Sequence, residues 1–212
     1  MALRIVVLLS GSGTTLENLI EWRAKGQLDI EIVAVVSSKP SAFGLERARR
    51  HGLATHAVDR RAYRDERGFN NALHRILDEY QPQLLVLAGF LTRLELRGYS
   101  GRTMNVHPAL VPAFSGKGYY GERVFRAVLE SAVKLTGVTV HFCDDEYDTG
   151  PIILQEAVAV EDDDSVDSLA RRVQEKERDL YPRAIQLYAE GRLQLQGRRV
   201  RILPPAPERT GP

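Results

Sequence analysis

Short apolar segments rich in β-branched residues alternate with helix-like segments along the first part of the chain. Such runs are typical of parallel strands that are buried on both faces of a sheet. The predicted strands cover residues 5–9, 30–36, 54–58 and 84–87. Apolar side chains at helical spacing predict the intervening helices at residues 15–25, 45–50 and 69–80. This alternation predicts an α/β fold with a doubly wound, mostly parallel sheet.

The second part of the chain has a different pattern. A short strand at residues 103–106 precedes a loop rich in proline and glycine at 108–121, and a helix is predicted at 124–132. Apolar and polar side chains alternate over residues 135–142, which predicts a half-buried strand. Another strand is predicted at 152–160. We therefore expect an antiparallel addition to the parallel sheet.

A long helix is predicted near the C-terminus, at residues 165–190. Pro182 lies inside it and is expected to bend or break it, because proline lacks the N–H that an inner turn requires. The acidic run at residues 161–164 is interpreted as a solvated loop that places negative charge before the helix.

Residues 193–195 and 200–203 are predicted to pair as a hairpin about Gly197. The proline-rich residues that follow are expected to be disordered. The prediction is thus a single domain over residues 1–203 with a tail at 204–212.

Composition narrows the functional classes. The 212 residues include 29 Lys and Arg against 28 Asp and Glu, for a net charge of +1, and 43% are hydrophobic. This is typical of a soluble globular protein and argues against a dedicated nucleic-acid binder. The longest apolar run, residues 84–91, is far shorter than the roughly 20 residues that cross a membrane. Cys143 is the single cysteine, so no internal disulfide forms, and a cytoplasmic setting is expected.

The turn at residues 10–15 joins a predicted buried strand to a helix. Its glycines let a ligand approach the backbone, and free amides at a helix start favour an anion such as phosphate. Leu16 stands where the dinucleotide fingerprint has its third glycine, and no Lys-Ser or Lys-Thr follows. Thr14 or Thr15 is a candidate cap for the helix. A phosphate site and a plain tight turn both remain open on this evidence.

Two further segments carry candidate chemistry. Asn105 and His107 lie two residues apart at a strand end, so their side chains point the same way. An amide donor beside an imidazole suits oxyanion stabilisation with proton transfer. Asp148, before a Gly-Pro turn, is a carboxylate that could orient the imidazole, and His141 on the preceding strand could join them. Structural roles for these histidines remain open, and the sequence shows no ligand spacing for a metal.

Taken together and in this order, these segments resemble the phosphoribosylglycinamide formyltransferases, a folate-dependent family of purine synthesis. The resemblance extends from Ile5 to about Pro205. Its most specific parts are Asn-Val-His-Pro at 105–108 with Leu-Val-Pro at 110–112, and the segment from Val140 to Ile153. It implies a Rossmann-like formyltransferase fold and transfer of a formyl group from 10-formyltetrahydrofolate to the glycinamide amine of the ribonucleotide. It also implies a cis bond before Pro112.

The resemblance also assigns roles to residues. The implied catalytic residues are Asn105, His107 and Asp148, with His141 in support. The implied ribonucleotide contacts are Gly13, Thr14, Thr15, Gln174 and Glu177. The implied folate contacts are Arg67, Phe90, Leu91, Thr92, Arg93, Leu94, Asn105, Asp144 and Asp148. The proposed reaction needs formyl folate as co-substrate and no metal. A protonated His107, held by Asp148, is expected to stabilise the oxyanion together with Asn105.

Some positions depart from the family's usual pattern. Thr15 stands where relatives usually carry Asn, and Arg93 is one place away from the commoner arginine position. Arg67 is the nearest counterpart of a further folate-side arginine, and Glu66 aligns equally directly.

Other functions would require domains or sequence motifs that differ from those predicted here. Formylation of methionyl-tRNA, hydrolysis of formyl folate and formylation of sugar nucleotides each call for an additional domain, for which this length is expected to leave no room. A nicotinamide-dependent dehydrogenase is disfavoured because Leu16 replaces the third glycine and Ser37-Ser38-Lys39 follows the second strand where an acidic residue would stand. A bare nucleotide-binding module would leave Asn105, His107 and Asp148 unexplained. The expected partners are small-molecule substrates without nucleic acid or membrane, and the chain is expected to be a monomer or homodimer.

Overall fold

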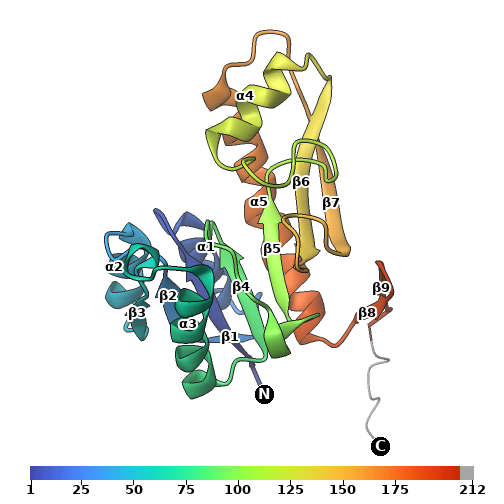
Figure 1. The fold of residues 1–212 in the computed structure, drawn as a ribbon. Coiled ribbons are helices and arrows are strands. Elements are labelled where there is room, and N and C mark those ends of the chain that lie inside the picture. Colours follow the sequence, from blue (N-terminus) through green and yellow to red (C-terminus); the bar gives the residue numbers. More distant parts are fainter. Residues whose placement is uncertain (206–212) are drawn as a thin grey trace, which may run out of the picture.

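The computed structural model describes residues 1–205. Its centre is a seven-stranded sheet in the order β3-β2-β1-β4-β5-β6-β7 (Figure 1). The parallel strands are β1 (Leu3–Leu9), β2 (Ile30–Ser37), β3 (Thr55–Ala57), β4 (Leu84–Ala88) and β5 (Thr103–His107). Two antiparallel strands follow, β6 (Leu135–Phe142) and β7 (Ile152–Ala159). The predicted doubly wound α/β fold with an antiparallel addition is confirmed.

Two apolar cores lie on opposite faces of this sheet. Side chains of β1 alternate between them, with Val6 in one core and Val7 in the other. Helix α3 (Glu66–Tyr80) covers the first face. The opposite face is covered by α1 (Thr14–Ala24), α2 (Phe43–Arg50), α4 (Glu122–Glu130) and α5 (Val166–Ala189). Single turns of 3₁₀ helix lie at Arg60–Ala62 and Arg97–Tyr99.

Helix α5 runs through Pro182 without a break, so the expected interruption of the helix is absent. Proline leaves the carbonyl of Arg178, four residues earlier, without an intrahelical donor. The side chain of Asn18 on α1 donates to that carbonyl at 2.8 Å. The hydrogen bond that Pro182 removes is thus replaced from a neighbouring helix.

Two other predictions about local structure were wrong. Gly13, in a left-handed conformation, caps α1, and no threonine side chain does. Strand β6 is buried on both faces after Leu135, because Thr139 hydrogen-bonds to Ala109 and Val111 in a segment that covers its polar face. The acidic run before α5 is a loop whose residues 161–163 are exposed, as predicted, and only its last residue is covered. The side chain of Asp164 is 2% exposed and pairs with Arg172.

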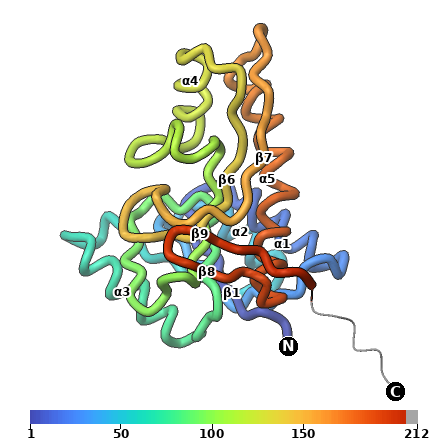
Figure 2. The backbone as a smooth tube through the Cα atoms, turned by 90° about the vertical axis from the view of Figure 1, so that its right-hand side faces the viewer, coloured from blue at the N-terminus to red at the C-terminus, as the bar shows by residue number. Residues whose placement is uncertain are grey.

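The C-terminal hairpin is confirmed. Strands β8 (Leu193–Gln196) and β9 (Arg199–Ile202) form a separate two-stranded sheet. Figure 2 shows it lying beside the turn that joins β6 to β7. Residues 206–212 of the expected tail lie outside the described residues. Within residues 1–205, no helix combines the length and apolar character needed to span a bilayer.

Candidate active site

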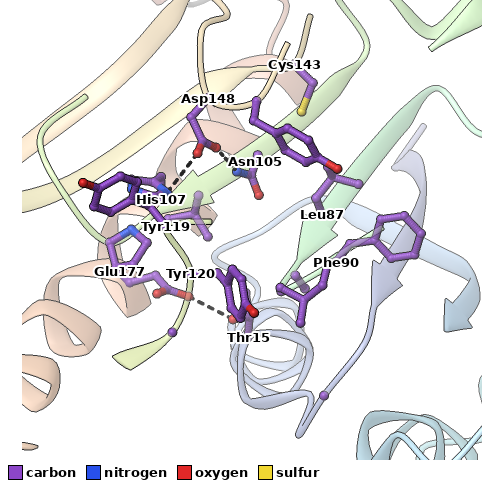
Figure 3. Close-up of a pocket in the computed structure, with 18 of the residues that line it drawn as sticks. Thr15, Leu87, Phe90, Asn105, His107, Tyr119, Tyr120, Cys143, Asp148 and Glu177 are labelled. Carbon is purple, nitrogen blue, oxygen red and sulfur yellow. Dashed lines mark hydrogen bonds and ion pairs between the residues drawn. The ribbon is translucent and has the colours of Figure 1, made fainter. Parts of the chain in front are cut away.

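A cavity of about 840 Å³ opens at the carboxyl ends of β1, β4 and β5. Ligands of open α/β sheets bind at this edge, where loops leave the strands. We call one part the loop end, comprising residues 11–18 and 174–178. We call the other the histidine end, formed around Asn105, His107 and Asp148. Both ends line the same cavity (Figure 3).

Asp148 joins the other two polar side chains of the histidine end (Figure 3). Its Oδ2 lies 3.4 Å from Nδ1 of His107, and its Oδ1 accepts from Nδ2 of Asn105 at 3.3 Å. Oδ1 also lies 3.6 Å from Nε2 of His141, so the structure brings all four predicted side chains together. These residues come from β5, β6 and the turn before β7.

The amide of Asn105 lies close to both His141 and Asp148. Its Nδ2 lies 3.3 Å from both Nε2 of His141 and Oδ1 of Asp148, which are themselves 3.6 Å apart. These three atoms form a nearly equilateral triangle. Asn105 also lines the cavity, so its amide lies within reach of a ligand bound there.

His107 is held at both ring nitrogens. Its Nε2 donates to the carbonyl of Phe114 at 2.8 Å, and Nδ1 faces Asp148. Burial lowers the pKa of His107 below its ordinary value, although the Asp148 carboxylate and the Phe114 carbonyl act in the opposite direction. The ligand-free site therefore disfavours a protonated His107, while the protonated ring expected during the reaction stays a prediction. Sequence reasoning counted the carboxylate, but the loss of solvent around the ring outweighs it.

The turn that carries Asp148 is tightly constrained. Asp148 has a positive φ of 57°, which costs energy for a residue other than glycine. Gly116 donates its backbone N–H to Oδ2 of Asp148 at 2.9 Å. A Cβ at Gly150 would lie 1.8 Å from the carbonyl oxygen of Phe142, so only glycine fits there.

Asp148 is ionised at neutral pH. Burial alone would raise its pKa, but the neighbouring His141, the Gly116 N–H and, whenever its ring is protonated, His107 together lower it. The histidine end thus presents a fixed negative charge between two imidazoles, next to an amide donor.

The loop end relies on close packing of backbone. A Cβ at Gly13, whose φ is +75°, would lie 2.5 Å from Cα of Gly44 at the start of α2. Gly44 also donates its N–H to the carbonyl of Gly11 at 3.0 Å. No side chain caps the first turn of α1, so its amides are available to an anion. This geometry favours the phosphate interpretation of the turn over a plain tight turn.

Thr15 contacts Glu177 across the loop end (Figure 3). The threonine hydroxyl donates to Oε1 of the carboxylate at 2.9 Å. Burial raises the pKa of Glu177, and the bond from Thr15 only partly opposes this. Thr14 and Gln174 line the same part of the cavity. Every predicted ribonucleotide contact therefore lies at the loop end.

The predicted folate contacts are mostly brought together as well. Phe90, Leu91, Thr92, Arg93, Leu94 and Asp144 line the cavity beside the histidine end. Phe90 stacks on Phe69 with ring centroids 6.3 Å apart, and Arg93 donates to the carbonyl of Asp145 at 3.1 Å. The structure does not bring Arg67 to this group, because its side chain is exposed on α3 and does not line the cavity.

Sequence reasoning missed several contributors. The Phe114 carbonyl and the Gly116 N–H are backbone groups, which no residue type announces. The hydroxyl of Tyr181 lies within hydrogen-bond distance of the carbonyls of both Leu87 and Met104, which ties the ends of β4 and β5 together. The bond before Pro112 is cis, as expected. Among residues 1–205, no group of three or more His, Cys, Asp or Glu is placed to hold a metal ion.

Comparisons with known proteins agree with this geometry. The family model described as formyl transferase matches residues 3–185. Phosphoribosylglycinamide formyltransferase of Escherichia coli is 39% identical over 196 residues, which cover 91% of this chain and 90% of that protein. The trifunctional purine biosynthetic protein adenosine-3 of Gallus gallus is 40% identical over 195 residues. The chain spans only 19% of that longer relative.

Solved structures give the same result. The crystal structure of glycinamide ribonucleotide transformylase 1 from Symbiobacterium toebii superposes with a TM-score of 0.90 at 43% identity. It covers 96% of this chain and 95% of its own. A formyltetrahydrofolate deformylase from Pseudomonas syringae, at 23% identity and a TM-score of 0.85, shares the fold. The family match, the curated relatives and the shared architecture place this chain in the formyl transferase family.

Proposed function

We propose that this protein is a phosphoribosylglycinamide formyltransferase. It transfers the formyl group of 10-formyltetrahydrofolate to the glycinamide amine of phosphoribosylglycinamide, a step of purine biosynthesis. The observation that carries the proposal is the Asn105, His107 and Asp148 cluster at one end of a cavity whose other end offers helix amides to an anion. The relatives named for this activity support the choice of substrates.

The ribonucleotide binds at the loop end. Its phosphate accepts from the free backbone amides that follow Gly13, at Thr14 and Thr15. Gln174 supplies an amide beside the phosphate. Glu177, already oriented by Thr15, accepts from the ribose hydroxyls. The glycinamide arm then extends toward the histidine end.

The folate binds beside the turn at residues 144–148. Phe90, Leu91 and Leu94 provide an apolar wall for the pterin, with Thr92, Arg93 and Asp144 at its polar edge. Arg93 is the folate-side arginine that the cavity supports, in preference to Arg67. The formyl group lies next to Asn105 and Asp148.

The reaction is an acyl transfer. The glycinamide nitrogen attacks the formyl carbon, and negative charge develops on the formyl oxygen. The amide of Asn105 donates to that oxygen, where a preorganised donor lowers the barrier. The bond to the folate nitrogen then breaks as that nitrogen gains a proton.

His107 and Asp148 manage the proton. The attacking amine must lose one proton, and the leaving folate nitrogen must gain one. Because burial keeps His107 neutral in the free site, its ring can accept a proton as charge develops. Asp148, 3.4 Å away, then stabilises the imidazolium. The pair relays the proton from the amine toward the leaving nitrogen, with water as a bridge.

An absorbance assay of folate deformylation tests the proposal directly. We expect deformylation to require phosphoribosylglycinamide, with one formylated product for each folate consumed. Equal rates with and without the ribonucleotide would instead identify a formyl folate hydrolase and contradict the proposal.

The wider setting is also proposed. The substrates are small molecules, and we propose that the chain acts in the cytoplasm as a monomer or homodimer, without nucleic acid or membrane. Gel filtration with light scattering distinguishes the two oligomeric states.

A further inference from the structure

The C-terminal hairpin reaches the turn that carries Asp148. Arg198, at the tip of the hairpin between β8 and β9, donates from Nη2 to the carbonyl of Thr149 at 2.6 Å. Thr149 directly follows Asp148. The hairpin lies beyond residues 3–185, where the family model matches.

The turn has few other supports on its exposed side. Asp145, Glu146, Tyr147 and Thr149 are exposed. Within the turn, Thr149 donates its hydroxyl to Asp144 at 2.7 Å. From outside, Arg93 donates to the carbonyl of Asp145, and Arg198 to that of Thr149. Two arginines therefore hold the backbone on either side of Asp148.

The positive φ of Asp148 makes this support important. A residue other than glycine keeps such a conformation only when its surroundings impose it. Gly150 fixes one side by its close approach to the Phe142 carbonyl. Thr149 is the one residue between Asp148 and Gly150, and Arg198 hydrogen-bonds to its carbonyl.

The hairpin is anchored well enough to act as a brace. Leu193 at its base and Val200 nearer its tip pack against the main core. Leu203 donates its N–H to the carbonyl of Arg192 at 2.8 Å, and Arg192 returns a side-chain bond to the carbonyl of Leu203. The base is thus fixed to the domain while the tip contacts the turn (Figure 2).

We propose that Arg198 is a positioning residue that holds the Asp148 carboxylate at its distance from Asn105 and His107. The proposal rests on the proposed function for its catalytic consequence, but the positioning itself does not depend on it. Displacing a reacting group by a fraction of an ångström lowers the rate of the chemical step more than it weakens binding.

The test compares Arg198→Gln with Arg198→Lys and with Arg199→Gln. Arg199 lies on the same hairpin and, among residues 1–205, makes no side-chain hydrogen bond or ion pair, so it is the matched control. The first readout is amide hydrogen exchange at Gly116, whose N–H donates to Asp148. The second is kcat and KM for both substrates, with the melting temperature measured alongside.

We expect Arg198→Gln to accelerate exchange at Gly116 about fivefold and to lower kcat about fivefold, with each KM changed less than twofold. Arg198→Lys should restore most of both, because a single cationic donor still reaches the carbonyl. Arg199→Gln should change neither.

Equal exchange at Gly116 in Arg198→Gln and Arg199→Gln would overturn the positioning role, whatever the assay shows. A loss of kcat that follows the melting temperature equally in both variants would also overturn it. If Gly116 responds as expected but the wild-type protein transfers no formyl group, the proposed function fails and the positioning role stands.

Discussion

The two ends of the cavity are built in different ways. The loop end works through backbone, because the amides of α1 are free and Gly13 packs against Gly44 with no room for a side chain. The histidine end works through side chains that hold one another, with Asp148 in contact with Asn105 and His107.

This difference determines which substitutions each end tolerates. At the loop end, the hydroxyl of Thr15 is the side-chain group that orients Glu177. A Cβ added at Gly13 would clash with the backbone of Gly44. At the histidine end, by contrast, even a substitution that keeps the size of a side chain removes a charge or a hydrogen-bond donor on which the neighbouring side chains depend. We therefore expect substitutions at the histidine end to lower kcat, and substitutions at the loop end to weaken binding of the ribonucleotide.

The largest effect is expected from Asp148→Asn. The variant keeps the shape of the side chain but removes the charge that stabilises a protonated His107. We expect kcat to fall about 1000-fold, within the range for acid–base groups, while ribonucleotide affinity changes little. Single-turnover kinetics and calorimetry measure the two separately. Lost ribonucleotide binding with unchanged single-turnover chemistry would reverse the assignment of the two ends.

His107→Ala should have the next largest effect. The substitution removes the proton carrier, and we expect turnover to fall roughly 100-fold or more with the fold intact. Circular dichroism of the purified variant checks the fold. A variant with near-normal turnover would remove His107 from the mechanism and leave Asp148 to act alone.

The sequence predicted the sheet well because its signals are local. Continuous apolar runs mark β1, β2 and β4 directly. The burial of β6 was not predictable in that way, because the segment around Ala109 and Val111 that covers its polar face comes from elsewhere in the chain. The unbroken α5 likewise depends on Asn18, a residue 160 positions from the carbonyl it satisfies.

In the candidate site, too, some groups can be read from the local sequence and others depend on the folded chain. Asn105, His107 and Asp148 were found because their residue types suggest chemistry. The Phe114 carbonyl and the Gly116 N–H were not, because every residue has these groups. The lowered pKa of His107 in the free site was not predictable for a related reason. The residue type shows a nearby carboxylate, whereas the loss of solvent is a property of the folded protein.

Gly13→Ala tests the loop end by steric means. The new Cβ would approach Gly44 in a left-handed conformation, which we expect to cost about 1–3 kcal/mol of stability. The displaced amides should raise KM for the ribonucleotide about tenfold, with kcat at saturation within about twofold. Gly98→Ala is the control, because its Cβ meets nothing within 4 Å. A fall in kcat without a change in KM would mean that the two ends are not separable.

Thr15→Val is a milder test of the same end. Valine keeps the volume but removes the hydroxyl that orients Glu177, a hydrogen bond worth about 1 kcal/mol. We expect KM for the ribonucleotide to rise about fivefold and kcat to stay unchanged, whereas Thr15→Ser should behave like the wild type. Steady-state kinetics with varied ribonucleotide concentration measure this. Equal KM values for the valine and serine variants would mean that the hydrogen bond from Thr15 to Glu177 does not contribute to binding.

The smallest effect is a pH dependence of stability from the histidine end. Burial lowers the pKa of His107 in the folded protein, so the unfolded chain binds a proton more readily. Stability from this group is therefore present above the unfolded value of 6.5 and is lost as the pH falls through it. When the pH is lowered from about 7.5 to about 5.5, the melting temperature of the wild type should fall further than that of His107→Gln, by a few degrees at most.

Glu177 contributes to the pH dependence with the opposite sign, since its raised pKa favours the folded state at low pH. Because Glu177 is present in both proteins, its contribution cancels in the difference. If the melting temperatures of the wild type and His107→Gln fall equally, burial does not lower the pKa of His107 in the folded protein.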